Sequence, residues 1–312
     1  MPNLDFSVQS WGNPSSPKRA LLLHGLMGTG AVWFKVAEIL VAQGHGWAPH
    51  SRPYNVQSVT QHLADHLRNQ DIPYEVIGGV SFGSSFASSL YSSLPENQKP
   101  KRLVLAEPIL DYPPFTKEAL DGMVNLTKDI PSEESILRAN PAWIRAEAVL
   151  RRLSLSLIDP EVIVQLSDAM VKGEFSHSNL LPSQSASSST EIIILGADPS
   201  VKTVYPPENS ERLEKEYPYV KFGWVKGATH DMHKSDAGVL AKVIVDGFVG
   251  AEKAGVTVLR GSRHEYSVNE DYIDEMMKSS QMSSVPMPTP PPILAISCWA
   301  TWVPPKKLLR VE

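Results

Sequence analysis

The sequence has few of the features that mark secreted, membrane-spanning or nucleic-acid-binding proteins. It contains 312 residues but only one cysteine, Cys298, so no disulfide can form within the chain. Runs of lysine and arginine are absent, and the net charge of -5 argues against nucleic acid or an anionic membrane surface as a partner. The longest apolar run, residues 293–303, is too short to cross a bilayer. We therefore expect no stable insertion into a membrane.

Two further absences narrow the class of protein. The first residues lack the basic and then apolar layout of a secretory signal, which together with the single cysteine favours a cytoplasmic location. No cluster of histidine, cysteine and carboxylate residues has the spacing of a metal site, and we expect no metal and no cofactor. A hydrophobic content of 42% allows one large core, or a core with a small accessory domain.

What the sequence does contain is a serine with a glycine at each second neighbour, in Gly79-Val80-Ser81-Phe82-Gly83. The pattern predicts a buried strand over residues 74–80 and a helix over 82–94, with Ser81 on the sharp turn between them. Such a turn strains the serine backbone, and both glycines must lack a Cβ for the helix to cross the strand closely. The serine hydroxyl would then lie exposed at the carboxyl edge of the sheet, although a turn rich in glycine and serine can also be only a packing device.

Apolar strand patterns and helical patterns alternate along most of the chain, which predicts an α/β fold with a mostly parallel central sheet flanked by helices. Between residues 111 and 190 only helical patterns occur, and we expect this part to form a cap or lid inserted into a core of residues 1–110 and 191–250. Residues 251–312 are rich in charge and proline, and we expect a largely disordered extension. An apolar patch in it could instead dock on the body or on a partner.

Two more candidates for chemistry follow later strands. Asp198 comes directly after the apolar residues 191–196, and His230 lies in a glycine-led loop after residues 220–225. A serine hydroxyl is a weak nucleophile at neutral pH, so it needs an imidazole to take its proton and a carboxylate to orient that imidazole. The order serine, acid, histidine is the one expected when the serine lies on a strand-to-helix turn.

Both partners of the serine have alternatives in the sequence. Glu107 or Asp111, which follow the preceding strand, could supply the carboxylate in place of Asp198. His233 could be the base in place of His230. Asp198 is favoured by its place directly after the apolar residues 191–196, and His230 is favoured by the Gly-x-x-His spacing.

With these motifs the chain resembles the α/β-hydrolase superfamily, in its branch of serine-nucleophile esterases and lipases, over about residues 4–250. The resemblance implies Ser81 as the nucleophile, His230 as general base and then acid, and Asp198 as the residue that orients the imidazole. It also implies an oxyanion hole, because His24-Gly25 opens a loop that contains two further glycines. The donors of that hole would be the backbone N–H groups of Leu26 and Phe82.

The pocket and one departure from the family can also be predicted. His24 is expected only to position the loop that carries Leu26. Residues 44–53 offer a very short strand where relatives have a full one, so several residues look missing from the sheet. Apolar residues under the cap could line an acyl pocket, although such residues more often form the core of the cap itself. The candidates for the pocket are Met27, Trp33 and Trp143, with Phe34, Tyr112, Phe115 and Phe175 in addition.

The sequence thus predicts a serine hydrolase that acts on a small to medium, rather apolar acyl compound, with a carboxylic ester as the leading substrate class. Hydrolysis of a C–C bond by the same fold is a close variant. The rival class is a protein of this fold that binds a small molecule without turning it over. Intact Ser81 and His230 favour catalysis, since a binding module needs neither a nucleophile nor a base.

Overall fold

The computed structural model describes most of the two expected core segments and of the expected cap. The described residues are 8–11, 16, 18–41, 55–68, 73–182, 189–201, 203–205, 207–253 and 293–296. The very short strand expected within residues 44–53 lies outside them, as does Cys298.

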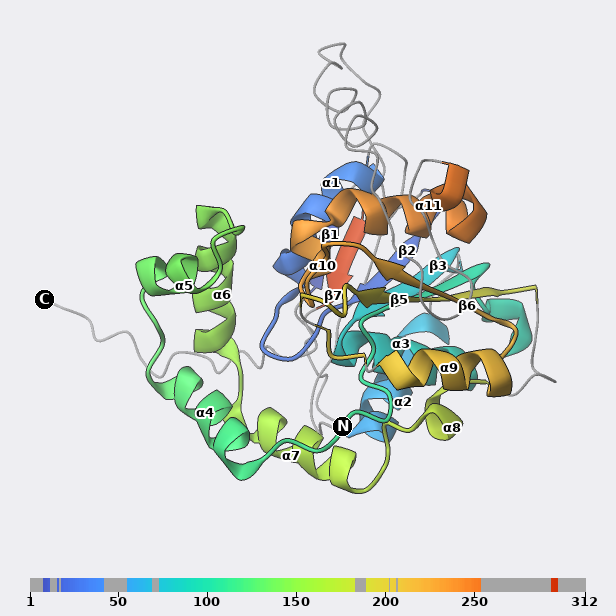
Figure 1. Ribbon diagram of the computed structural model, residues 1–312. Coiled ribbons are helices and arrows are strands. Elements are labelled where there is room, and N and C mark those ends of the chain that lie inside the picture. The colour runs from blue at the N-terminus through green and yellow to red at the C-terminus, as the bar shows by residue number, and fades with distance from the viewer. Residues whose placement is uncertain are drawn as a thin grey trace, which may run out of the picture.

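Within the described residues, the centre of the molecule is a sheet with the strand order β1-β7-β2-β3-β4-β5-β6 (Figure 1). Five of these strands, neighbours from β2 to β6, run parallel to one another, as the alternating pattern predicts. The side chains of the first four, β2 to β5, are almost all buried, because helices cover both faces of the sheet, whereas the edge strand β6 is partly exposed. The five are β2 (Ala20–Leu23), β3 (Val76–Val80), β4 (Arg102–Ala106), β5 (Glu191–Ala197) and β6 (Val220–Val225).

The sheet beyond β2 is built from segments near the two ends of the chain. β7 (Ile293–Ile296) runs parallel to β2 and antiparallel to β1 (Val8–Trp11), so that Ala295 is paired with Leu22 on one side and with Gln9 on the other. The expectation of a largely disordered extension is therefore corrected for these four residues. They supply the strand beside β2, on the side away from β3. Residues 254–292 and 297–312 of the expected extension lie outside the described residues.

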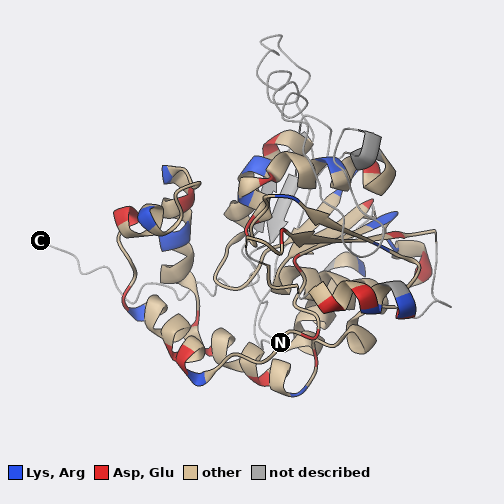
Figure 2. Cartoon of the chain, in the orientation of Figure 1, with Lys and Arg blue, Asp and Glu red and all other residues tan. Residues whose placement is uncertain are grey.

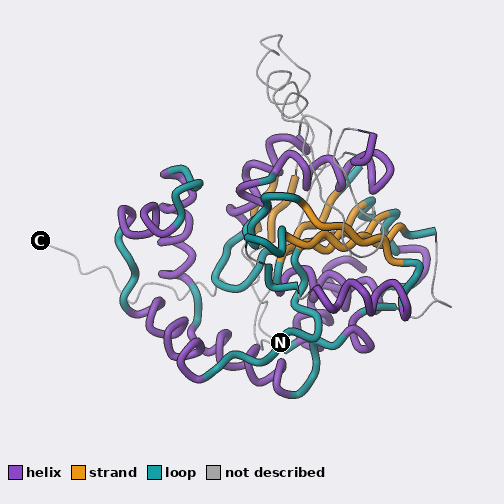
Figure 3. The backbone as a smooth tube through the Cα atoms, in the orientation of Figure 1, coloured by secondary structure: helices purple, strands orange, loops and turns teal. Residues whose placement is uncertain are grey.

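Helices lie on both faces of the sheet (Figures 1 and 3). One face is covered by α1 (Phe34–Val41) and α11 (Ala237–Lys253), and the other by α2 (Val56–Arg68), α3 (Phe82–Ser93) and α9 (Pro207–Glu216). Short helical turns join these elements. They are η1 (Gly30–Trp33), η2 (Glu96–Gln98), α8 (His177–Leu180) and α10 (Met232–Ser235).

The first two helices bury apolar residues at helical spacing. Val36, Ala37 and Leu40 of α1 are fully buried, and so is Val59 of α2, with Leu63 almost fully buried beside it. This burial of apolar residues at intervals of three and four fixes how each helix faces the sheet.

The stretch expected to be a helical cap contains helices and no strand in its described residues, 111–182 and 189–190, and Figure 1 shows these helices beside the sheet rather than in its layers. Polar side chains cap three of the four longer ones: Thr116, Ser132 and Asp159 each accept a hydrogen bond from a first-turn backbone N–H. Positive and negative side chains are interspersed along these helices (Figure 2). The four are α4 (Lys117–Lys128), α5 (Glu133–Ala139), α6 (Arg145–Leu157) and α7 (Pro160–Val171).

Candidate active site

Ser81 lies on the turn between β3 and α3 with a backbone that only glycine adopts easily. Its φ is 57° and its ψ is -130°. A Cβ on Gly79 would lie 2.4 Å from the carbonyl carbon of Gly83, and a Cβ on Gly83 would lie 2.1 Å from the carbonyl oxygen of Leu23. The predicted close crossing of the helix over the strand is therefore confirmed. Strained serine backbones persist where the surrounding structure holds them, and such strain gathers at functional sites.

Phe82 and Leu26, the two residues expected to supply the oxyanion donors, line one cavity together with Ser81. Phe82 is the first residue of α3, so its N–H has no acceptor within the helix, and the positive end of the helix dipole lies there. The loop that carries Leu26 passes close to the serine, since a Cβ on Gly25 would lie 2.8 Å from the Cβ of Ser81.

Two hydrogen bonds fix the peptide group between Gly25 and Leu26. The carbonyl oxygen of Gly25 accepts from the backbone N–H of Gly28 at 3.2 Å and from Nδ1 of His24 at 2.7 Å. His24 is fully buried, and burial lowers its pKa to about 4, so at neutral pH it is an uncharged imidazole that donates through its Nδ1–H. Because the peptide is trans, the N–H of Leu26 points away from these two bonds.

His230 meets Glu107 and not Asp198. Its Nδ1 lies 3.2 Å from Oε2 of Glu107, whose side chain has no exposed surface. The other partners of this carboxylate are donors as well: Oε1 accepts from the Ala197 N–H and the Thr203 hydroxyl, and Oε2 accepts from the Val204 N–H. An ionised carboxylate only accepts, so it satisfies all four donors, and His230 must carry its proton on Nδ1. Nε2 of His230 is then left as the acceptor.

Asp198 instead holds the base of the loop that carries His230. Its Oδ2 accepts from the Gly227 N–H at 2.8 Å, and its Oδ1 accepts from the N–H and the hydroxyl of Ser200. Partial burial alone would raise the pKa of this carboxyl, but these hydrogen bonds outweigh it and lower the pKa below its ordinary value. With both oxygens engaged in this way, Asp198 does not take the place beside His230 that the sequence analysis expects for it.

The remaining alternatives lie in other environments. Asp111 pairs with Nδ1 of His177 and with Nη1 of Arg212, the latter at 2.5 Å. His233 lines the cavity but is 5% exposed, and its Nδ1 is buried without a hydrogen-bond partner. Burial lowers its pKa to about 3, with the charge of Lys234 adding to the effect. Neither Asp111 nor His233 takes part in the contact between His230 and Glu107.

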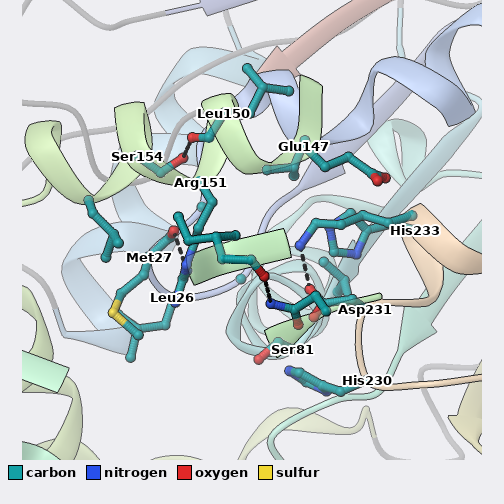
Figure 4. Close-up of a pocket in the computed structure, with 18 of the residues that line it drawn as sticks. Leu26, Met27, Ser81, Glu147, Leu150, Arg151, Ser154, His230, Asp231 and His233 are labelled. Carbon is teal, nitrogen blue, oxygen red and sulfur yellow. Dashed lines mark hydrogen bonds and ion pairs between the residues drawn. The ribbon is translucent and has the colours of Figure 1, made fainter. Parts of the chain in front are cut away.

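A cavity of about 540 Å³ lies between the sheet edge and the cap, and both Ser81 and His230 line it (Figure 4). This volume is within the range of about 300 to 1,000 Å³ typical of small-molecule sites. Of the three expected pocket residues, Met27 and Trp143 line the cavity, whereas Trp33 is 1% exposed and packs in the core against His233. The other apolar lining residues come mostly from the cap and its connections: Ile109, Tyr112, Phe115, Met123, Leu126, Ile136, Leu150 and Leu155.

The described part of the chain contains neither a metal-binding cluster nor a membrane-spanning helix. Among those residues, no group of three or more histidine, cysteine, aspartate or glutamate side chains is arranged to hold a metal ion. In the same part of the chain, none of the helices combines the length and the apolar character that crossing a bilayer requires.

The parallel sheet, the inserted helices and the serine turn together define the α/β-hydrolase fold. The solved structure of the esterase EaEST from Exiguobacterium antarcticum matches with a TM-score of 0.59 at 13% identity, covering 77% of this chain and 94% of that one. A structure described for carboxylesterases of Nitrososphaera gargenis matches with a TM-score of 0.57 at 14% identity, covering 81% and 98%. Likeness at such low identity shows the fold alone.

A sequence relative gives a closer comparison. The chain is 31% identical over 150 residues to Lipase LipV of Mycobacterium tuberculosis (strain ATCC 25618 / H37Rv). The match covers 45% of this chain and 56% of the lipase, so the chain spans about half the length of this relative. No protein-family model matches the chain.

Proposed function

We propose that this protein is a carboxylic-ester hydrolase in which Ser81 is the nucleophile, His230 the general base and acid, and Glu107 the carboxylate that orients His230. The observation that carries the proposal is the contact between Nδ1 of His230 and Oε2 of Glu107, at a cavity that Ser81 also lines. A buried carboxylate held by three other donors gives the imidazole one tautomer and one orientation. A protein that only binds its ligand has no need of such an arrangement.

The first half of the reaction follows from this arrangement. Ser81 attacks the carbonyl carbon of the ester through its Oγ, while Nε2 of His230 takes the hydroxyl proton. The negative charge of Glu107 stabilises the imidazolium that forms. The carbonyl oxygen becomes an oxyanion, and we assign its two donors to the backbone N–H groups of Leu26 and Phe82. His230 then gives its proton to the leaving alkoxide, and an acyl-enzyme remains.

The second half repeats these steps with water in place of the serine. His230 takes a proton from the water, the hydroxide attacks the acyl carbon, and the same two N–H groups hold the second oxyanion. The proton returns to Oγ of Ser81 when the carboxylic acid leaves. Each bond that forms is matched by one that breaks, and no further reagent is needed.

The lining of the cavity supports an apolar acyl group of small to medium size as the substrate. Most of the side chains that face it are aliphatic or aromatic, and its volume of about 540 Å³ holds more than an acetyl group. The partial identity with a protein named as a lipase supports an ester as the substrate class. The proposal includes a cytoplasmic location, for which the single cysteine is the support.

The test uses the purified full chain with a fluorophosphonate probe and a series of p-nitrophenyl esters of increasing acyl length. We expect the probe to label Ser81 and the esters to be hydrolysed, with both signals lost in Ser81→Ala. Ser93→Ala is the matched control, because Ser93 lies on the same helix, is exposed, and donates only to the carbonyl of Leu90. Full hydrolysis by Ser81→Ala, or no labelling of the wild type, would refute the proposal.

A further inference from the structure

The cap contacts its surroundings at the cavity through α6 and the residue just before it. Glu147 and Arg151 lie four residues apart on α6, and Trp143 lies directly before the N-cap residue of this helix, Ile144. All three line the cavity, and we call them together the stripe on α6. Figure 4 shows Arg151 extending from α6 toward Met27, with a dashed line for the hydrogen bond between them. Arg152, the next residue, is exposed to solvent.

Arg151 reaches the loop that carries the proposed oxyanion donor. Its Nη1 donates to the carbonyl oxygen of Met27 at 2.9 Å, across 124 positions of the sequence. Met27 has a φ of 57°, a left-handed backbone that side-chain-bearing residues rarely adopt. A conformation of this kind persists only where neighbouring groups hold it. Arg151 is such a group, and the residue whose carbonyl it holds, Met27, directly follows Leu26.

The other two residues of the stripe tie α6 to the core. Glu147 is 2% exposed and pairs with Nζ of Lys35 at 2.9 Å, and its Oε2 accepts from the N–H of Ile144 at the start of α6. Lys35 in turn donates to the backbone carbonyl of Lys234. Trp143 lies under Nζ of Lys234, at 3.6 Å from the ring centroid.

Lys234 belongs to the segment that follows His230. Its Nζ pairs with Oδ1 of Asp231 at 2.7 Å, and the charge of Asp231 also acts favourably on Arg151. The stripe on α6 therefore contacts the loop of Leu26 at one end and the segment after His230 at the other. If the cap moved away from the core, these contacts would break together.

We propose that Arg151 is a positioning residue for the ester hydrolysis: by holding the carbonyl of Met27, it keeps the loop of Leu26 in the shape that completes the oxyanion hole, so that the hole is complete only while the cap is seated. This inference rests on the proposed function. Arg151 touches neither the nucleophile nor the base. Its effect reaches the reaction through the backbone of Met27 and Leu26.

The test compares Arg151→Met with Arg152→Met on one p-nitrophenyl ester. Methionine keeps much of the apolar stem of arginine and removes the donor to Met27. We expect kcat of Arg151→Met to fall about tenfold or more, less than the 10²-fold to 10³-fold typical when an oxyanion donor itself is removed. KM should change little, and Arg152→Met should keep the wild-type values. Circular dichroism and thermal unfolding check that both variants are folded.

Two readouts separate positioning from a merely structural role. A boronic acid that forms an adduct with the serine should lose affinity for Arg151→Met in step with the loss of kcat/KM, because the adduct places an oxygen in the same hole. Added guanidinium ion at concentrations that leave the protein folded should restore part of the activity of Arg151→Ala, and none should be gained by Arg152→Ala.

The outcomes are distinguishable. If the wild type hydrolyses esters and Arg151→Met keeps the same kcat as Arg152→Met, the inference is wrong and the proposed function stands. A loss confined to KM would also overturn the inference, since Arg151 would then only shape the pocket. A wild type that neither hydrolyses esters nor reacts with the fluorophosphonate would overturn the proposed function, and the inference with it.

Discussion

Nδ1 of His230 lies 3.2 Å from Oε2 of Glu107, although 123 positions separate the two residues in the sequence. Glu107 follows β4, the strand next to β3 with its serine, whereas Asp198 follows β5, one strand further away. The neighbouring strand thus supplies the carboxylate. The sequence analysis raises Glu107 only as an alternative, and the geometry reverses that preference.

Replacing Glu107 should therefore cripple turnover, and replacing Asp198 should not. In Glu107→Gln the charge that stabilises the imidazolium is lost, and His230 can present the wrong tautomer to Ser81. The corresponding change in the serine-protease triad, which is a worked example for this chemistry, costs about 10⁴ in turnover, so we expect a loss of at least several hundredfold in kcat. KM should change much less. The turnover number on one ester, with circular dichroism as a check of folding, gives the measurement.

Asp198→Asn is the matched variant. An asparagine can still accept from Gly227 through its side-chain oxygen, so the loop of His230 should keep most of its support. We expect a loss in kcat far smaller than that of Glu107→Gln. If Asp198→Asn had lost most of its kcat and Glu107→Gln had nearly the wild-type kcat, Asp198 would be the carboxylate that orients His230, as the motifs predict.

The serine turn could be predicted because its pattern is local. Gly79, Ser81 and Gly83 stand within five positions of one another, directly after an apolar strand, and that pattern predicts the turn even though Gly83 also packs against the distant Leu23. The choice between the two acids depends instead on distant partners. The groups that hold Glu107 are Ala197, Thr203 and Val204, at least 90 positions away, so no local pattern could reveal them.

Two further features depend on contacts that are equally remote. β7 pairs with β1 and β2 from the other end of the chain, and a four-residue apolar segment carries no signal of its pairing partner. The role of Arg151 also depends on where the cap packs. Its spacing of four from Glu147 and eight from Trp143 is visible in the sequence. Charged residues at such spacing usually indicate a solvent-exposed helix face, however, and only the fold shows that these residues line the cavity.

Removing the C-terminal segment should destabilise the protein. A chain that ends at Lys253 lacks β7, and with it the ladder to β2 and the ladder to β1. β2 would then present an unpaired edge, which favours aggregation. We expect a clear drop in melting temperature and greater aggregation on heating, measured by calorimetry and light scattering against the full chain. Identical melting curves would show that residues 293–296 contribute nothing to the sheet.

The crossing of α3 over the sheet should tolerate no Cβ at Gly83. In Gly83→Ala the new Cβ would lie 2.1 Å from the carbonyl oxygen of Leu23. The atoms nearest to it belong to the backbone of Leu23 and His24, which cannot move away as a flexible side chain can. We expect a loss of about 4 kcal/mol or more in the free energy of unfolding, or no folded protein. Gly122→Ala is the control, because nothing lies within 4 Å of the Cβ it would add.

The control Gly122→Ala should instead raise the free energy of unfolding. Gly122 lies inside α4, and alanine is favoured over glycine within a helix by up to about 1 kcal/mol. Urea unfolding of the two variants beside the wild type measures both effects. Equal stability of Gly83→Ala and the wild type would mean that α3 crosses β2 at a greater distance than described here.

Mild acid should destabilise the fold through two buried histidines. Burial lowers the pKa of His24 to about 4 and that of His233 to about 3, from the ordinary value of 6.5. Between pH 6.5 and pH 5 the unfolded chain therefore binds protons at both side chains while the folded protein binds almost none. Because the unfolded state binds more protons, stability is fully present above pH 6.5 and falls as the pH is lowered toward the folded pKa values.

The size of this effect follows from the same values. A pKa unit corresponds to about 1.4 kcal/mol, so each histidine should remove about 2 kcal/mol of unfolding free energy between pH 6.5 and pH 5. Urea unfolding at intervals of half a pH unit measures the slope. In His233→Phe an apolar ring replaces the imidazole that packs against Trp33, and we expect that slope to fall. The rest of the slope belongs to His24 and to His177, whose pKa burial also lowers. A slope that is the same in the variant and the wild type would mean that His233 is already protonated in the folded protein, contrary to its burial among Trp33 and Lys234.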